Sequence, residues 1–384
     1  MIYFDNAATG GAKPPSVISA TCEAIKSANA NPGRSGHALS VTLAQNLLNC
    51  RKLLDGFFGG YGFERVIFTK NCTEALNAAL FGFANALPAG KKAHVITTVM
   101  EHNSVLRPLR ALERAGKTEL TVLGLNGEGT VPPEAFAAAA REDTAAAVFT
   151  LASNVTGAQI DPAAVKAVLP EGALVICDGA QACGHIPLHM RAQGIDALCA
   201  AGHKGMHGVA GSGVLLFSER FDPAPLLYGG TGSESADPDM PSFYPDRLEA
   251  GTLNYPAAMS LFEGTIYLKA HMEENVAYVK GMTRSLICGL KKIAGIRVYS
   301  QPNPFGIVSF RCGGAQSELF AQELSDRYGI AVRGGLHCAP LMHEALGSAG
   351  EGLVRASLSE FNTPHEVQTF LLAAEKIARS VTSF

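Results

Sequence analysis

The sequence predicts an α/β fold built on a mostly parallel, doubly wound sheet, and three observations support this class. Short apolar runs alternate with helix-like stretches between about residues 65 and 217. The run 173–177 is apolar throughout and 195–200 is apolar except for Asp196, which is typical of strands buried between two helical layers. Polar residues follow the ends of these runs, where parallel sheets bind their ligands.

The bulk composition describes a well-buried protein with few charges. At 384 residues the chain exceeds the usual limit of a single core, so two domains are expected. Hydrophobic residues make up 47% and charged residues only 17%, with a net charge of −3 and no Lys/Arg-rich run. We therefore expect no nucleic-acid partner and no membrane partner. No apolar stretch reaches the roughly 20 residues that span a bilayer, and residues 1–6 lack the pattern of a signal peptide.

The cysteines indicate a reducing compartment. Nine are scattered along the chain without a Cys-x-x-Cys pair, which argues against a disulfide framework and against a structural zinc site. Cys177, Cys199 and Cys288 lie among apolar residues and are expected to be buried. The sequence thus predicts a cytoplasmic protein without a bound metal.

Helices and strands are expected in a regular order. Pro14 and Pro15 suit the first turn of a helix, and a second helix is expected over about 37–55. Strands follow at 65–69, 94–98, 119–123, 145–151, 173–177, 195–200 and 213–217, with helices at 73–84, 104–114 and 162–168 between them.

The composition changes after the last of these strands. Residues Tyr228–Asp246 are rich in Gly, Ser, Asp and Pro and are expected to form a long functional loop. A helix over about 257–290 then leads into a smaller α+β part, with strands near 307–310, 331–333 and 353–357 and helices near 317–328 and 365–380. The predicted division is a large domain, 14–256, and a small domain formed by 1–13 and 257–384.

Two charged residues follow apolar runs. Asp178 comes directly after the run 173–177, and Lys204 follows a second run, between His203 and Gly205. A buried acid and a buried lysine at strand ends are the two groups that a pyridoxal phosphate (PLP) enzyme requires. The lysine forms a Schiff base with the cofactor, and the acid keeps the pyridine nitrogen protonated. The alternative is a buried ion pair, which needs neither the histidine nor the glycine.

Three further turns could serve a cofactor at the same edge. Thr73 stands where a strand passes into a helix, a place that binds phosphate but is more often a plain N-cap. His102 follows the strand 94–98 and could stack on a cofactor ring, or be an ordinary loop histidine. Asn154 could donate to an oxygen of the cofactor ring, with ordinary turn chemistry as the alternative.

Two residues near the C-terminus suit chemistry on an amino acid. Cys338 follows a histidine in a Gly-rich stretch, and a thiolate near His or Arg is a reactive nucleophile. A buried loop cysteine is the alternative. Arg355 lies in an apolar strand and therefore needs a carboxylate partner, supplied either by a substrate or by a structural salt bridge.

Together these motifs resemble one family along nearly the whole chain. The string Arg333-x-Gly-x-His-Cys338-Ala is similar to that of group II (SufS/Csd-like) cysteine desulfurases, which are class V aminotransferases of PLP fold type I. The other matching segments are 5–9, 73–74, 101–102, 153–154, 178–181, 202–204, 249–252 and 355–358. The resemblance implies a large domain with a mostly parallel seven-stranded sheet flanked by helices, and a smaller α+β C-terminal domain.

The resemblance also implies a role for individual residues. Lys204, Cys338 and His102 resemble the catalytic set, with Lys204 as the Schiff-base lysine. The implied cofactor contacts are Lys204, Asp178, Gln181, Asn154, His102, Thr73, Cys72, His203 and Thr252, and the implied substrate contacts are Arg355, Arg333, Asn6 and Ala7. Thr252 resembles a phosphate ligand taken from the neighbouring subunit, which implies a homodimer with shared active sites. Two residues depart from the family: Ala201 stands where the family often has a serine, and Cys72 where many members have threonine or alanine.

The implied activity is the conversion of L-cysteine to L-alanine with transfer of sulfur to Cys338 as a persulfide. PLP is the implied cofactor, and a protein that accepts the sulfur, such as an iron–sulfur scaffold, is a possible partner. A selenocysteine lyase, or another class V aminotransferase or lyase on the same scaffold, is the alternative enzyme. A PLP-binding module without catalytic activity is the alternative outside enzymes.

Overall fold

The computed structural model describes residues 1–27 and 30–381, and within them seven strands form the main sheet. The strands lie in the order β2-β8-β7-β6-β5-β3-β4. Their bounds are β2 (Val66–Thr69), β3 (Ala93–Thr98), β4 (Thr118–Leu123), β5 (Thr144–Thr150), β6 (Leu174–Asp178), β7 (Ala197–Ala201) and β8 (Gly213–Phe217). Strand β8 is antiparallel to both of its neighbours, and the other neighbouring pairs are parallel. The predicted α/β class and the mostly parallel sheet are confirmed.

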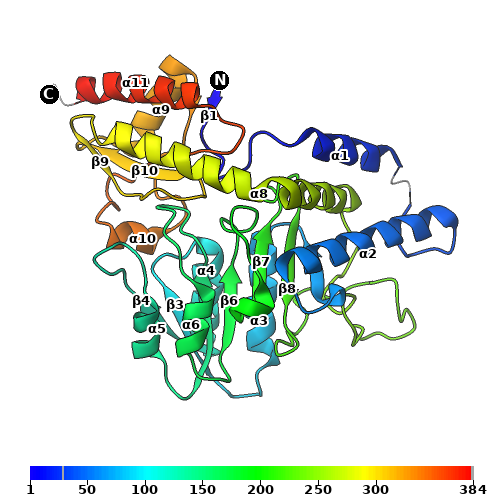
Figure 1. Ribbon diagram of the computed structural model, residues 1–384. Helices are drawn as coiled ribbons and strands as arrows, with labels where there is room; N and C mark the ends of the chain where they lie inside the picture. The colour runs from blue at the N-terminus through cyan, green and yellow to red at the C-terminus, as the bar shows by residue number, and fades with distance from the viewer. Residues whose placement is uncertain (28–29, 382–384) are drawn as a thin grey trace.

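Helices cover both faces of this sheet (Figure 1). On one face, α3 and α4 pack Leu76 and Leu109 against strand residues such as Ile176. On the other face, α2, α5, α6 and the first half of α8 contribute to a second core that includes Phe58 and Phe149. The bounds are α2 (Ala38–Phe58), α3 (Cys72–Ala86), α4 (Asn103–Arg114), α5 (Pro133–Ala139), α6 (Pro162–Val168), α7 (Met190–Gln193) and α8 (Tyr255–Leu290), with a short 3-10 helix at Phe63–Arg65. Alternate residues of each strand thus supply opposite cores, which explains the continuous apolar runs.

A smaller α+β unit carries the C-terminal part of the chain. Its antiparallel sheet has the order β12-β10-β9, and β1 pairs in parallel with β11 beside it. Phe4, Phe310, Phe320 and Phe370 belong to its separate core. Its elements are β1 (Ile2–Tyr3), β9 (Ile296–Val298), β10 (Ile307–Cys312), α9 (Ser317–Tyr328), β11 (Ile330–Ala331), α10 (Pro340–Ala345), β12 (Val354–Ser357) and α11 (Pro364–Val381).

One long helix, α8, connects the two parts. It packs against α1 (Pro15–Ser27) and α2 near its start and against β10 and α11 near its end, so it runs across the molecule (Figure 1). The N-terminal segment also crosses between the parts, because β1 lies in the small unit and α1 lies against α8. The predicted domain division stays a prediction, and its residues 28–29 and 382–384 lie outside the described residues.

The predicted strands agree with the structure to within two residues at each end. Short elements were not predicted, namely β1, β9, α5, α7 and α10, because two to seven residues carry too little periodic pattern. Residues Tyr228–Asp246 form an irregular segment, as expected. Cys177 and Cys199 are buried, but the prediction for Cys288 is wrong, because its side of α8 faces solvent. No helix in the described part of the chain combines the length and apolar character needed to cross a membrane.

Candidate active site

A cavity of about 190 Å³ opens at the carboxyl ends of the parallel strands. Thr150, Asp178 and Ala201 are the last residues of β5, β6 and β7, and all three line it. The other lining residues are Ala7, Ala8, Asn71, Cys72, Thr73, Leu76, His102, Ser104, Asn154, Ala180, Gln181, His203, Lys204, Arg333, His337 and Arg355. The cavity thus collects side chains from the sheet edge, the N-terminal segment and the small unit.

Lys204 and Asp178 face this cavity without pairing with each other. Lys204 comes three residues after β7, and its ammonium has no hydrogen-bond or ion-pair partner among the described residues. Burial lowers its pKa, which Asp178 opposes. The buried carboxylate of Asp178 accepts a bond from the Ala180 N–H (2.9 Å) through Oδ1, while Oδ2 has no partner in the described part. The structure therefore does not contain the simple ion pair that was the alternative.

Groups that suit an anion lie at one end of the cavity. Helix α3 begins there, capped by Asn71, whose Oδ1 accepts a bond from the Glu74 N–H (2.9 Å). The first N–H groups of a helix lack acceptors within it and attract negative charge. The hydroxyl of Thr73 lies 2.8 Å from that of Ser104, and His203 Nδ1 lies 3.0 Å from the Thr9 hydroxyl.

His102 presents a neutral imidazole to the cavity. It caps helix α4, because its Nδ1 accepts a bond from the Ser104 N–H (3.0 Å). Burial lowers the pKa of His102 to about 4, despite the opposing effect of Asp178. The proton of the neutral ring is therefore on Nε2, and the flat ring is available for stacking.

Two arginines on adjacent backbone segments also line the cavity. Arg355, on β12, is 1% exposed and pairs with Asp5 (3.0 Å), and it also donates to the Asn154 carbonyl (2.9 Å). Its Nε has no hydrogen-bond partner in the described part of the chain. Arg333 exchanges backbone bonds with Arg355 (3.1 and 2.7 Å) and makes no ion pair with any described residue. A carboxylate ligand would complete this pair of cations.

Cys338 lies just outside the cavity lining, next to Arg333. Its side chain is exposed, and an Arg333 guanidinium N–H donates to its Sγ (3.7 Å). The buried-cysteine alternative is therefore wrong. Cys338 and His337 both have left-handed backbones, with φ of 58° and 51°.

Two predicted cofactor contacts also make bonds within the chain. The Asn154 amide donates to the His337 carbonyl (2.7 Å), and the Gln181 amide donates to the Ala7 carbonyl (3.0 Å). Both side chains still line the cavity, as do Ala7 and Cys72. Cys72 is buried, with its Sγ 3.5 Å from Asp178 Oδ1.

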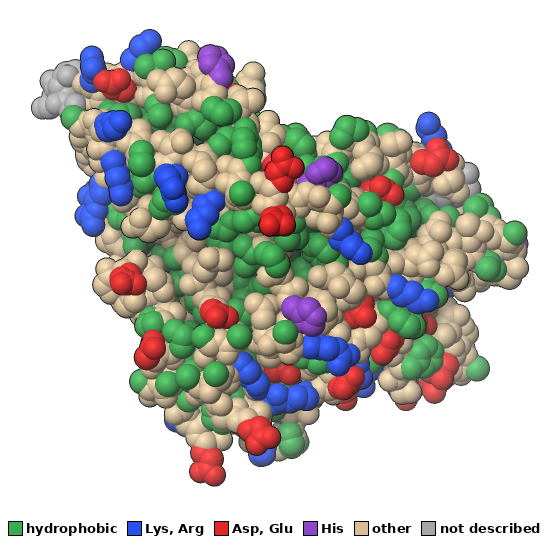
Figure 2. Space-filling view, in the orientation of Figure 1, with side chains coloured by type: hydrophobic (Ala, Val, Ile, Leu, Met, Phe, Trp, Pro, Cys, Tyr) green, Lys and Arg blue, Asp and Glu red, His purple; other side chains and the backbone are tan. Residues whose placement is uncertain are grey.

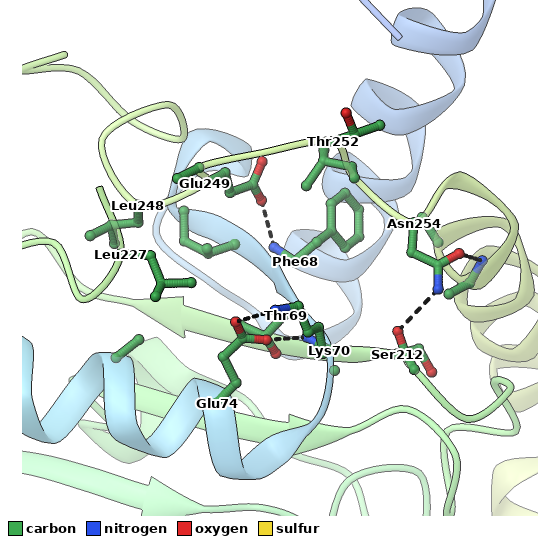
Figure 3. A pocket seen from close by; sticks show the side chains of 18 of the residues that line it. Phe68, Thr69, Lys70, Glu74, Ser212, Leu227, Leu248, Glu249, Thr252 and Asn254 are labelled. Carbon is green, nitrogen blue, oxygen red and sulfur yellow. Dashed lines mark hydrogen bonds and ion pairs between the residues drawn. The ribbon is translucent and has the colours of Figure 1, made fainter. Parts of the chain in front are cut away.

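Asn6 and Thr252 lie apart from the cavity. The Asn6 amide donates to the Ser357 carbonyl (2.9 Å) and holds the N-terminal segment against β12. Thr252 is exposed and lines a different cavity of about 420 Å³, above the start of α3. Figure 3 shows it on the segment between Glu249 and Asn254, on the far side of Phe68 from Glu74. Within one chain, Thr252 does not reach the Lys204 cavity.

Sequence reasoning overlooked three residues around the site. Ser104 and His337 line the cavity, and each stands beside a residue that the sequence did indicate. Glu101 is fully buried beneath it, where Oε1 accepts a bond from the Thr98 hydroxyl (2.6 Å) and Oε2 has no partner among the described residues. Burial raises the pKa of Glu101 to about 8. An acid directly after an apolar strand was the signal available for it.

A lysine and an aspartate at the carboxyl edge of a doubly wound sheet, with an anion-binding helix end beside them, define a PLP-dependent enzyme of fold type I. The chain belongs to the class V aminotransferase family, which it matches over residues 2–370. It is 33% identical to a probable cysteine desulfurase of Methanothermobacter thermautotrophicus, over 98% of this chain and 94% of that protein. It is 31% identical to a cysteine desulfurase of Escherichia coli, over 99% and 94%.

Solved structures agree with the fold. A cysteine desulfurase of Thermococcus onnurineus, determined in its apo form, superposes with a TM-score of 0.89 at 29% identity, covering 99% of this chain and 95% of that one. The cysteine desulfurase CsdA of Escherichia coli has the same fold, with a TM-score of 0.88 at 24% identity and coverage of 99% and 94%.

The residues of this chain fit the cofactor on which the family depends. Lys204 and Asp178 Oδ2, which have no partner among the described residues, are the groups that would meet its aldehyde and its pyridine nitrogen. The start of α3 suits the phosphate, and His102 suits the face of the ring.

Proposed function

We propose that this chain is a cysteine desulfurase in which Cys338 receives the sulfur. The observation that carries the proposal is the exposed Cys338 thiol beside Arg333, at the mouth of a cavity that holds Lys204, Asp178 and Arg355. The names of the relatives support the substrate, L-cysteine.

Lys204 binds the cofactor and moves the substrate proton. When bound, PLP withdraws electrons from the substrate Cα through its protonated ring. Asp178 lines the same cavity, and its carboxylate would hold the ring proton of the cofactor. The amine of Lys204 takes the Cα proton, and its burial favours the neutral form that a base requires.

Cys338 performs the sulfur step. Its thiolate attacks the substrate sulfur, so an S–S bond forms and the Cβ–S bond breaks. The electron pair of the broken bond stays on carbon, which takes a proton, so that alanine and a Cys338 persulfide are the products. Sulfur is oxidised as carbon is reduced, and no external oxidant is needed. Arg333 lies beside this thiol and donates a hydrogen bond to its Sγ, so a cation faces the attacking sulfur.

The arginines hold the substrate carboxylate. Arg355 is fixed by Asp5 and by the Asn154 carbonyl, which leaves its unpartnered Nε and the neighbouring Arg333 for the ligand. A bidentate contact of this kind orients the substrate Cα toward Lys204.

A homodimer would bring Thr252 to the second active site, in line with its exposed position away from its own cavity. Exposed hydrophobic residues on α1 and α2 (Ile18, Ile25, Leu39 and Val41) support an interface there. In Figure 2, hydrophobic side chains gather between charged ones in the region of these helices. The unpaired thiols suit a reducing cytoplasm, and a separate protein would take the sulfur from Cys338.

The test is Cys338→Ala, with Cys22→Ala as the control because Cys22 is another exposed cysteine. We expect alanine release from L-cysteine to fall by roughly 100-fold or more, and the persulfide at position 338 to vanish from intact-mass spectra. Cofactor absorbance and exchange of the L-alanine Cα proton in D2O should persist. Undiminished turnover of L-cysteine would contradict the proposal. Turnover that is much faster with L-selenocysteine and insensitive to Cys338→Ala would favour the lyase alternative.

A further inference from the structure

The loop that carries Cys338 needs support from outside itself. We call residues 333–338 the Cys338 loop. Its last two residues have left-handed backbones (φ of 51° and 58°), which residues with side chains rarely adopt. Two of its carbonyls are held from the large sheet: Asn154 donates to the His337 carbonyl and the Asn103 N–H donates to the Cys338 carbonyl, both at 2.7 Å.

A chain of buried side chains holds the same loop from the other side. The ring of His337 stacks on that of His343, with centroids 5.4 Å apart and 29° between their planes. His337 Nδ1 lies 3.2 Å from His343 Nε2, and His343 Nδ1 lies 2.9 Å from the Ser348 hydroxyl. His337 Nε2 lies 3.3 Å from the Arg333 carbonyl. His337 is 2% exposed, and His343 and Ser348 are 0% exposed.

The hydrogen bonds of this chain have one direction. The Arg333 carbonyl only accepts, so His337 Nε2 carries the proton and, in a neutral ring, His337 Nδ1 accepts. His343 Nε2 must then donate to it, which leaves His343 Nδ1 to accept from the Ser348 hydroxyl at 2.9 Å, a shorter contact than the 3.4 Å from that hydroxyl to the His343 carbonyl. Burial lowers the pKa of both histidines, in agreement with two neutral rings.

We propose that Ser348, His343 and His337 form a positioning chain that holds the Cys338 loop in its reactive geometry. The chain ends on the backbone of Arg333, whose side chain contacts Cys338 Sγ, so it ties the two ends of the loop together. Buried donors and acceptors cost free energy unless each is paired, so apolar side chains in place of the two histidines would pack at a lower cost. Apolar side chains could not, however, form the directed hydrogen bonds that hold the loop. The role in sulfur transfer rests on the proposed function of Cys338.

The main test is Ser348→Ala in the PLP-loaded enzyme. Its matched control is Ser218→Ala, because Ser218 is also buried and donates to Asp196 (2.8 Å), at the opposite edge of the sheet. We expect both variants to lower the melting temperature by a similar amount. Only Ser348→Ala should speed hydrogen–deuterium exchange in peptides covering 333–343.

The kinetic signature should separate positioning from folding. For Ser348→Ala we expect kcat for alanine release from L-cysteine to fall about 10-fold or more. KM should rise by a smaller factor, because Arg355 is untouched and only Arg333, of the two arginines, lies in the loop. Exchange of the L-alanine Cα proton should stay at the wild-type rate, since Lys204 does not depend on this loop. The proposal would be overturned if Ser348→Ala and Ser218→Ala had the same kcat and the same amide hydrogen–deuterium exchange in peptides covering 333–343.

Two further measurements keep the proposal testable if Ser348→Ala does not fold. His343→Gln keeps a donor toward His337, whereas His343→Leu removes it, so Gln should retain several-fold more activity and more loop protection. In the wild-type protein, nitrogen NMR of labelled histidine should show His337 and His343 as neutral Nε2–H tautomers at pH 7. A charged ring or an Nδ1–H tautomer at either position would refute the chain. Amide hydrogen–deuterium exchange and the histidine tautomers are measured without turnover. They therefore test the positioning chain even if L-cysteine is not the substrate.

Discussion

Lys204 and Cys338 are placed by two different kinds of structure. Lys204 follows β7, which lies between β6 and β8 in the main sheet, and the preceding carbonyl of His203 accepts bonds from Gly10 (2.9 Å) and Lys13 (3.1 Å). The sheet and these two bonds, one from a backbone N–H and one from a side chain, therefore fix the backbone beside Lys204. Cys338 stands on a loop between β11 and α10, in a left-handed conformation. Side chains distant in sequence hold that loop, such as Asn154, which is 183 residues from His337.

The difference suggests a division of labour. A residue near a strand end moves little, which suits a lysine proposed to hold the cofactor and to remove the Cα proton of the substrate. A loop residue can reach the cavity and then face a partner, which suits a cysteine that must pass its sulfur on. Substitution of Lys204 should therefore remove all chemistry, and substitution of Cys338 should remove only sulfur transfer.

The largest effect is expected for Lys204→Ala. The variant should lose alanine release by at least roughly 1,000-fold, because both cofactor attachment and proton removal depend on this amine. Exchange of the L-alanine Cα proton should be lost as well, in contrast to Cys338→Ala. Chromatography of alanine and NMR in D2O measure the two losses.

Lys70→Ala is the control for this experiment, because Lys70 is an exposed lysine near the start of α3. It should leave both rates unchanged. If borohydride reduction fixed the cofactor to any lysine other than Lys204, the contrast between the two regions would lose its basis.

Arg355→Lys should have the next largest effect. Lysine keeps the charge but loses the planar fork, so KM for L-cysteine should rise roughly 10- to 100-fold with a smaller change in kcat. Asp5→Asn tests the structural role of Arg355 separately from substrate binding, because it removes the internal partner of Arg355 and leaves the guanidinium in place. It should lower the melting temperature with little change in KM. A KM that is unchanged in Arg355→Lys would make the arginine purely structural.

The strand edge was predictable from the sequence, and the loop only in part. Asp178 and Lys204 follow apolar runs whose pattern is local, so their common edge could be inferred before the structure. The bond from Arg355 to Asp5 joins residues 350 apart, and no local pattern indicates it. No local pattern indicates the partners of His337 either, because its ring stacking and its protonation depend on the packing of helix α10 beside it. Thr252 was assigned by resemblance alone, and the role proposed for it needs a second chain.

Glu101→Gln should have the smallest effect on activity and tests whether the strand edge contains a neutral acid. Burial raises the pKa of Glu101 from 4.5 to about 8. Between these two pH values the folded protein keeps the carboxyl proton, while the unfolded chain has lost it. The raised pKa therefore costs no stability below about pH 4.5, and the protein loses stability as pH rises toward 8. The loss is at most roughly 5 kcal/mol.

Glutamine cannot ionise, so the variant should lack this decline and be more stable than the wild type at pH 8. Melting temperatures at pH 5 and pH 8 measure the difference, with Glu128→Gln as the exposed control. If both variants follow the wild type at both values, Glu101 is charged in the folded protein. Its Oε2, which has no partner among the described residues, would then need a cation beside it at the edge that holds Lys204.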